Sequence, residues 1–130
     1  MKRNLTLILM TLTLTSCFIS DYESEIITSP SENYGIKARI NRTDKSAADY
    51  ANVLIDLFDS DGSKLTEINS SAGDASKWTI GWTELGDTIV LQSSDIGNKA
   101  WALTNGRPTE IKMTDKLNDR AQYLYSKKYE

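Results

Sequence analysis

The chain has 130 residues, with 15 lysines and arginines, 18 aspartates and glutamates, no histidine and one cysteine. This length fits a single domain. The lack of histidine excludes Ser-His-Asp and Cys-His mechanisms and imidazole-based metal sites, and one cysteine excludes an intrachain disulfide and a Cys-rich metal site. A net charge of −3 and a pI near 5.0 argue against nucleic-acid binding, which requires a clustered basic surface.

The N-terminal residues contain the parts of an export signal in the usual order. Lys2 and Arg3 are positively charged, and a ten-residue apolar stretch runs from Leu5 to Leu14. This stretch is shorter than the roughly 20 residues that a membrane-spanning helix needs. Residues 1–16 are therefore predicted to be a signal peptide that is removed from the mature protein.

The residues that end this segment, Leu14-Thr15-Ser16-Cys17, resemble the lipobox of bacterial lipoproteins. The resemblance implies cleavage between Ser16 and Cys17, a diacylglycerol on the Cys17 sulfur and an acyl chain on its new amine, with no other cofactor. Two or three acyl chains attach a protein to a membrane far more firmly than one. Phe18 stands where an aspartate would signal inner-membrane retention, so the resemblance implies the periplasmic face of the outer membrane in a Gram-negative host. The inner membrane and the cell surface stay open.

Two other interpretations of this region remain. Residues 5–14 can form a short buried helix with Cys17 as a core thiol, or an ordinary signal peptidase can cleave the chain without lipid attachment. The helix is disfavoured because polar residues do not recur at helical spacing and no acidic residue precedes Asp21.

The rest of the chain divides into a tether and a domain. Residues 17–33 are acidic, rich in serine and interrupted by Pro30, which predicts a flexible tether after the lipidated cysteine, although Glu25-Ile26-Ile27 can begin a strand. Residues 34–130 are predicted to form a single β-rich domain with a C-terminal helix.

From Tyr34 onward, apolar residues alternate with polar ones between turn signals, which is typical of strands. The turn signals include Asp61-Gly62, Gly86-Asp87 and Asn105-Gly106. The pattern predicts a mainly β (α+β) fold, an antiparallel meander of about six or seven short strands. These strands are expected at 36–40, around Val53, Ile55 and Leu57, at 64–69, around Trp78, Ile80 and Trp82, and at 88–92, 99–104 and 108–113.

The C-terminal segment changes to a helical period. Thr114 is a suitable N-cap for a helix over about 115–128. Leu117, Ala121 and Leu124 are spaced so that they form one apolar stripe, which is expected to pack on or beside the sheet.

Acidic residues suggest two kinds of site. The run from Asp56 to Ser63 (DLFDSDGS) fits either a calcium loop or a hairpin turn, and the turn is favoured because the EF-hand register places Leu57 and Ile68 at ligand positions. A hydrolase would need two facing carboxylates, for which Asp56, Glu67, Glu84 and Asp95 are the candidates on paper. Neither a metal site nor a catalytic residue is predicted.

Aromatic residues are the candidates for binding. Trp78, Trp82 and Trp101, with Tyr34 and Tyr50, form either a stacking platform or part of the core, and the core is favoured because Trp78 and Trp82 alternate with Ile80. The residues predicted to contact a partner are Trp101, Tyr123, Tyr125 and Tyr129.

A second resemblance lies in the middle of the chain. Residues 77–82 (KWTIGW), 87–91 (DTIVL) and 93–97 (SSDIG) resemble a pattern shared by small exported bacterial proteins. It implies a hairpin followed by a turn and no activity. In this turn, Ser94 and Asp95 are expected to accept hydrogen bonds from backbone N–H groups, and Gly97 to take a positive φ.

Three functions are consistent with these observations. Without the signal peptide the net charge is −5, and a non-enzymatic, inhibitor-like or immunity-like module can use an acidic face to bind a cationic protein in the cell envelope. The alternatives are a structural lipoprotein that maintains the envelope and, less favoured, a small carboxylate-based hydrolase.

Overall fold

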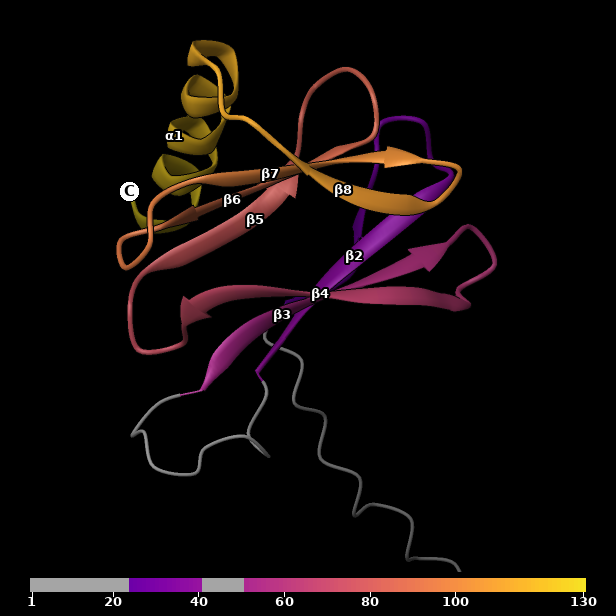
Figure 1. The fold of residues 1–130 in the computed structure, drawn as a ribbon, viewed down its shortest axis with the longest axis horizontal. Helices are drawn as coiled ribbons and strands as arrows, with labels where there is room; N and C mark the ends of the chain where they lie inside the picture. The colour runs from indigo at the N-terminus through magenta and orange to yellow at the C-terminus, as the bar shows by residue number, and fades with distance from the viewer. Residues whose placement is uncertain (1–23, 41–50) are drawn as a thin grey trace, which may run out of the picture.

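The computed structural model describes residues 24–40 and 51–130, and Figure 1 shows two layers of strands with one helix beside the second layer. Each layer is a four-stranded antiparallel sheet, in the order β1-β2-β3-β4 and β5-β6-β7-β8. The mainly β fold with a C-terminal helix is thus confirmed, but the strands form two sheets, and the described residues contain eight strands. The elements are β1 (Ile27–Thr28), β2 (Tyr34–Ile40), β3 (Asn52–Asp59), β4 (Lys64–Gly73), β5 (Trp78–Trp82), β6 (Thr88–Ser93), β7 (Lys99–Thr104), β8 (Arg107–Ile111) and α1 (Asp115–Tyr129).

The two sheets pack face to face because each contributes one apolar face. In the first sheet, Ile36 lies opposite Leu57 and Ala38 opposite Ile55, and all four side chains are fully buried. The second sheet contributes residues from β5, β6 and β7 to the same core, namely Trp78, Ile80, Trp82, Ile89, Leu91 and Trp101. The alternation seen in the sequence therefore separates a core face from an outer face in both sheets.

Strand β1 lies within the segment that was predicted to be a tether. Ile27 pairs with Ile36 and Thr28 with Gly35, and the Ser24 hydroxyl accepts a hydrogen bond of 2.9 Å from the Ala38 N–H. Residues 24–33 therefore belong to the folded unit, which places the domain start earlier than residue 34. Ser16, Cys17 and the signal peptide lie outside the described residues, as does Tyr50.

The predicted turns use the expected backbone chemistry. In the β3–β4 hairpin, Asp59 Oδ1 accepts hydrogen bonds from the Asp61 and Ser63 N–H groups, and Gly62 has a φ of +86°. This confirms the turn interpretation of residues 56–63, and it places Asp56 back on strand β3.

The turn after β6 also matches its prediction, and it ties the two sheets together. Ser94 Oγ accepts from the Lys77 N–H, and Asp95 Oδ2 accepts from the Gly73 N–H at the end of β4. Gly97 has a φ of +88°. The serine and aspartate therefore act as backbone acceptors in this turn.

Helix α1 covers the outer face of the second sheet. Thr114 Oγ1 accepts from the Leu117 N–H, which confirms the N-cap. Leu117, Ala121 and Leu124 pack against Val90 and Ala100 together with Ile111 and Met113, so the predicted stripe is confirmed. None of the described residues forms a helix long and apolar enough to cross a membrane.

Gly81 lets α1 approach β5 closely because it has no side chain. A Cβ atom at this position would lie 2.9 Å from both terminal methyl carbons of Leu124. Glycine therefore lets the helix pack directly on the strand backbone.

Candidate binding groove beside strand β5

Strand β5 forms an edge of the second sheet, and its register shows which backbone groups face outward. The Thr83 N–H bonds the Thr88 carbonyl, and the Ser94 N–H bonds the Lys77 carbonyl. Antiparallel pairing alternates, so residues 77, 79, 81 and 83 point their backbone groups at β6. The N–H and C=O groups of Trp78, Ile80 and Trp82 therefore point toward the open edge.

Side chains of α1 occupy both ends of this edge. The Tyr129 hydroxyl accepts from the Trp78 N–H at 3.0 Å and donates to the Trp78 carbonyl at 2.8 Å, and Lys128 Nζ donates to the same carbonyl at 2.6 Å. At the other end, Arg120 Nε donates to the Trp82 carbonyl at 2.7 Å. Such caps protect an edge strand from unwanted pairing.

Ile80 lies between the two capped residues. In the part of the chain that the structure describes, no residue bonds its outward N–H or C=O group. A hollow of about 550 Å³ opens here, between β5, the β1 segment (Ile27, Thr28 and Pro30) and the C-terminal half of α1. The middle of the edge therefore faces this hollow, with Ile80 itself 5% exposed, while the carbonyls at both ends are capped.

A second hollow of about 510 Å³ continues along α1. Both hollows are lined by Thr83, Glu84, Arg120 and Tyr123.

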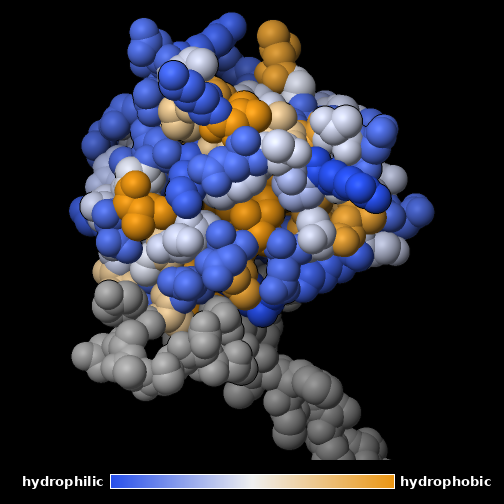
Figure 2. Space-filling view, viewed as in Figure 1, coloured by the Kyte–Doolittle hydropathy of each residue, from blue (hydrophilic) through white to orange (hydrophobic). Residues whose placement is uncertain are grey.

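On the described residues of the face seen in Figure 2, hydrophobic side chains show as separate patches between hydrophilic ones. That face is suited to polar recognition more than to a large apolar interface.

Cations and aromatic rings alternate along the wall formed by α1. The Arg120 guanidinium carbon lies 4.9 Å, and Lys127 Nζ 5.6 Å, from the centre of the Tyr123 ring. Lys128 Nζ lies 3.8 Å from the centre of the Trp78 ring. We call the β5 edge together with Arg120, Tyr123, Lys127 and Lys128 the basic groove. Backbone carbonyls hold Arg120 and Lys128, and Lys127 lies over the Tyr123 ring at the exposed side of the groove.

The residues predicted to bind a partner differ in exposure and in their contacts. Tyr123 is 49% exposed and lines both hollows. Tyr125 is half-buried with its ring centre 4.8 Å from that of Tyr129, and the Tyr129 hydroxyl holds the Trp78 backbone. Among the tyrosines of α1, Tyr123 is thus the exposed one that lines both hollows.

Trp101 was predicted to contact a partner, but the structure places it in the core. It is only 5% exposed, because its side chain shares the inward face of β7 and lies opposite Ile89 in the core. The favoured core interpretation is likewise confirmed for Trp78 and Trp82, which are 7% and 3% exposed. The Trp82 indole donates to the Ile27 carbonyl at 2.8 Å.

The candidate carboxylates are spread over three places. Asp56 and Glu67 lie opposite each other on the outer face of the first sheet, Glu84 lines the basic groove, and Asp95 bonds the Gly73 N–H. Among the residues described, no cluster of three or more His, Cys, Asp and Glu side chains is arranged to hold a metal ion.

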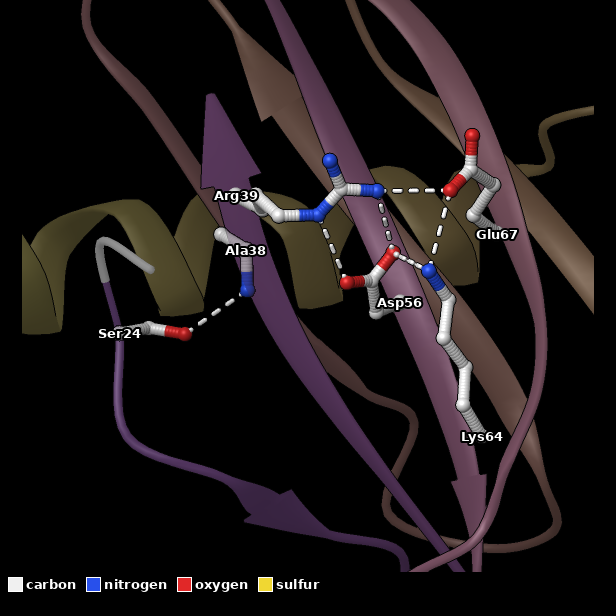
Figure 3. A network of polar contacts seen from close by, with 6 residues as sticks. All are labelled: Ser24, Ala38, Arg39, Asp56, Lys64 and Glu67. Carbon is white, nitrogen blue, oxygen red and sulfur yellow. Dashed lines mark hydrogen bonds and ion pairs between the residues drawn. The ribbon is translucent and has the colours of Figure 1, made fainter. Parts of the chain in front are cut away.

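Asp56 and Glu67 are joined through two cations (Figure 3). Arg39 donates from Nε to Asp56 at 2.9 Å and from a terminal nitrogen to Glu67 at 2.6 Å. Lys64 Nζ lies 3.3 Å from Asp56 and 3.1 Å from Glu67. We call these four residues the charge cluster. Both carboxylates pair with both cations, and the Asp56 side chain is fully buried.

The charge cluster also affects Lys64. Burial by itself lowers the pKa of this lysine, but its hydrogen bonds to Glu67 and Asp56 outweigh burial and raise the pKa above its usual value of 10.5. The lysine therefore stays charged throughout the neutral and mildly alkaline range.

The basic groove was not predicted from the sequence. Arg120, Tyr123 and Lys127 are spaced i, i+3, i+7, which places them on one helix face, and this spacing was the available signal. Lys127 and Lys128 also lie in the last turn of α1, where positive charge is favourable next to the negative end of the helix dipole.

Comparison of the chain with models of protein families, with curated proteins and with solved structures found no match.

Proposed function

We propose that this protein is a lipid-anchored lipoprotein on the periplasmic face of the outer membrane. It acts there as a non-enzymatic binding module, of the inhibitor or immunity kind, for another protein of the cell envelope. The observation that carries the binding role is the basic groove, where an exposed tyrosine, cations and a strand edge that faces a hollow converge. Surfaces rich in tyrosine and arginine dominate protein recognition.

The position of the groove agrees with anchoring at Cys17. Ser24 lines the groove and follows Cys17 by seven residues. An extended chain spans at most about 3.5 Å per residue, so the groove lies within about 25 Å of the lipid-bearing residue. A partner is therefore met close to the membrane surface.

The charge of the groove points to an acidic partner surface. Although the whole protein is acidic, the groove wall has three cations, Arg120, Lys127 and Lys128, against Glu84 on its rim. This differs from the sequence-based expectation of an acidic face that binds a cationic protein, because the fold places the basic residues of α1 beside strand β5, which is distant in sequence. Complementary charge increases the association rate and selects the partner.

Lipid attachment is tested by metabolic labelling with an alkyne fatty acid. The wild-type protein is expected to carry the label and to sediment with outer membranes. Cys17→Ser is expected to lose the label and to leave the membrane fraction, because two or three acyl chains supply the anchor. As a matched control, Phe18→Asp should keep the label but sediment with inner membranes. Label that persists in Cys17→Ser would refute the anchor.

The binding role is tested by placing a photo-crosslinking amino acid at Tyr123 in living cells. A discrete cross-linked partner is expected at Tyr123, and none at Leu65, which is 43% exposed but lies on β4 away from the groove. Lys127→Glu should reduce the cross-link at least tenfold because it reverses a groove charge. Equal products at both positions, or none, would contradict the proposed role.

A further inference from the structure

We propose that the basic groove binds a short extended peptide segment that adds to the edge of β5 opposite Ile80. The segment has the pattern acidic-apolar-acidic and belongs to the partner protein. This inference rests on the proposed binding function and specifies the chemistry of the partner.

The backbone of Ile80 defines how the segment is held. Its N–H and C=O groups face the hollow, while Trp78 and Trp82 on either side have their carbonyls capped by Tyr129, Lys128 and Arg120. A strand edge with an open residue between two residues whose carbonyls are capped accepts one pair of backbone hydrogen bonds at that residue from an extended peptide. The caps therefore set both the length and the register of the contact.

Strand geometry then assigns the side chains of the segment. The residue opposite Ile80 points its side chain to the same face as Ile80, which is the side of the hollow lined by Ile27 and Pro30. That wall is suited to an apolar side chain.

The flanking residues of the segment point the other way, toward the face of Thr79 and Gly81. This is the face that α1 covers, since Leu124 contacts Gly81. Arg120, Tyr123 and Lys127 line the hollow on this side. Lys127 has its charge over the Tyr123 ring, 5.6 Å from the ring centre, and is exposed to solvent. Carboxylates at the flanking positions would therefore meet these cations.

The alternative ligand for a basic groove near a membrane is an anionic lipid headgroup. A phosphate accepts hydrogen bonds, so it can satisfy the Ile80 N–H but cannot donate to the Ile80 carbonyl. The paired donor and acceptor of a strand edge therefore favour a peptide over a lipid phosphate.

The test uses full-length protein purified in detergent and the fluorescent peptide Gly-Glu-Ile-Glu-Gly, with Gly-Lys-Ile-Lys-Gly as its matched control. We expect saturable binding of the first peptide, at least tenfold tighter than that of the second. Lys127→Glu should weaken it at least tenfold. Lys112→Glu, an exposed charge reversal away from both hollows, should leave it unchanged.

A peptide that is N-methylated at its isoleucine separates strand pairing from simple charge attraction. It cannot donate to the Ile80 carbonyl, so its affinity should fall at least tenfold. Equal affinity of the methylated peptide, or displacement of the peptide by phosphatidylglycerol vesicles with no effect of methylation, would overturn the proposal. A cross-link at Tyr123 with no peptide binding would reject this inference and keep the binding function, whereas loss of both would reject the two together.

Discussion

Arg39→Met is expected to lower the free energy of unfolding by about 3 kcal/mol. Arg39 donates to both oxygens of Asp56, at 2.9 and 3.1 Å, and the Asp56 side chain is fully buried. The variant removes the two-pronged contact from this buried carboxylate, while the contact with Lys64 Nζ at 3.3 Å remains. A buried charge that loses its two-pronged partner keeps the cost of desolvation with less compensation. Urea unfolding at neutral pH measures the change.

The control for this prediction is Glu67→Gln in the same cluster. Glu67 is 50% exposed, and its contacts with Arg39 and Lys64 lie at the surface, so the expected loss is below about 1 kcal/mol. The pKa of Lys64 is raised in the folded protein. Its ion pairs therefore contribute fully to the free energy of unfolding below pH 10.5, and this contribution is lost only as the pH rises through the folded-state pKa. If Arg39→Met and Glu67→Gln lowered the free energy of unfolding equally at neutral pH, the burial of Asp56 would not explain the effect of Arg39→Met.

Trp82→Ala is expected to destabilise the fold by about 3–5 kcal/mol. The Trp82 side chain is 3% exposed and fills the space between the two sheets. Its indole also donates to the Ile27 carbonyl, so the substitution removes both core volume and a bond from β5 to β1. The measurement is thermal and urea unfolding followed by circular dichroism.

Two variants separate the contributions of Trp82. Trp82→Phe keeps an aromatic ring but removes the indole N–H, and it should cost about 1–3 kcal/mol, because the bond to the Ile27 carbonyl and part of the buried ring are lost. Tyr123→Ala removes an aromatic side chain that is 49% exposed and should cost about 0.5 kcal/mol or less. A Trp82→Ala variant as stable as Tyr123→Ala would show that this indole does not support the core.

Individual strands and the helix could be predicted because their signals, apolar spacing and capping residues, lie within each segment. Lys99–Thr104 was expected as a strand and forms β7, and the helix expected over 115–128 extends from Asp115 to Tyr129. In both segments the spacing of apolar residues matches the period of the element. Thr114 caps the helix with its own side chain, so its role depends only on the residues that follow it.

Other features depended on contacts between distant segments. Ile27 and Thr28 form a strand because β2 offers an edge to pair with; residues 17–33 were predicted to be a tether in which a strand beginning at Glu25-Ile26-Ile27 stayed open. Trp101 was named as a partner contact although the core was favoured for the tryptophans, and its register with Ile89 places it in the core. Pairing register is a long-range property, and a shift of one residue would expose the same side chain.

For this protein, the sequence by itself determined the β-rich class, the turns, the C-terminal helix and the expectation of a lipidated Cys17, since each rests on neighbouring residues. The tertiary structure decided that the strands divide into two sheets, that Asp56 is buried among cations, and that Ile80 is the open position of an edge strand. It also gathered Arg120, Lys127 and Lys128 of α1 beside Trp78 and Trp82 of β5, about 40–50 residues earlier in the chain. The physical reason is that charge and hydrogen-bonding groups act through space, so a groove formed by separate elements exists only once packing has brought them together.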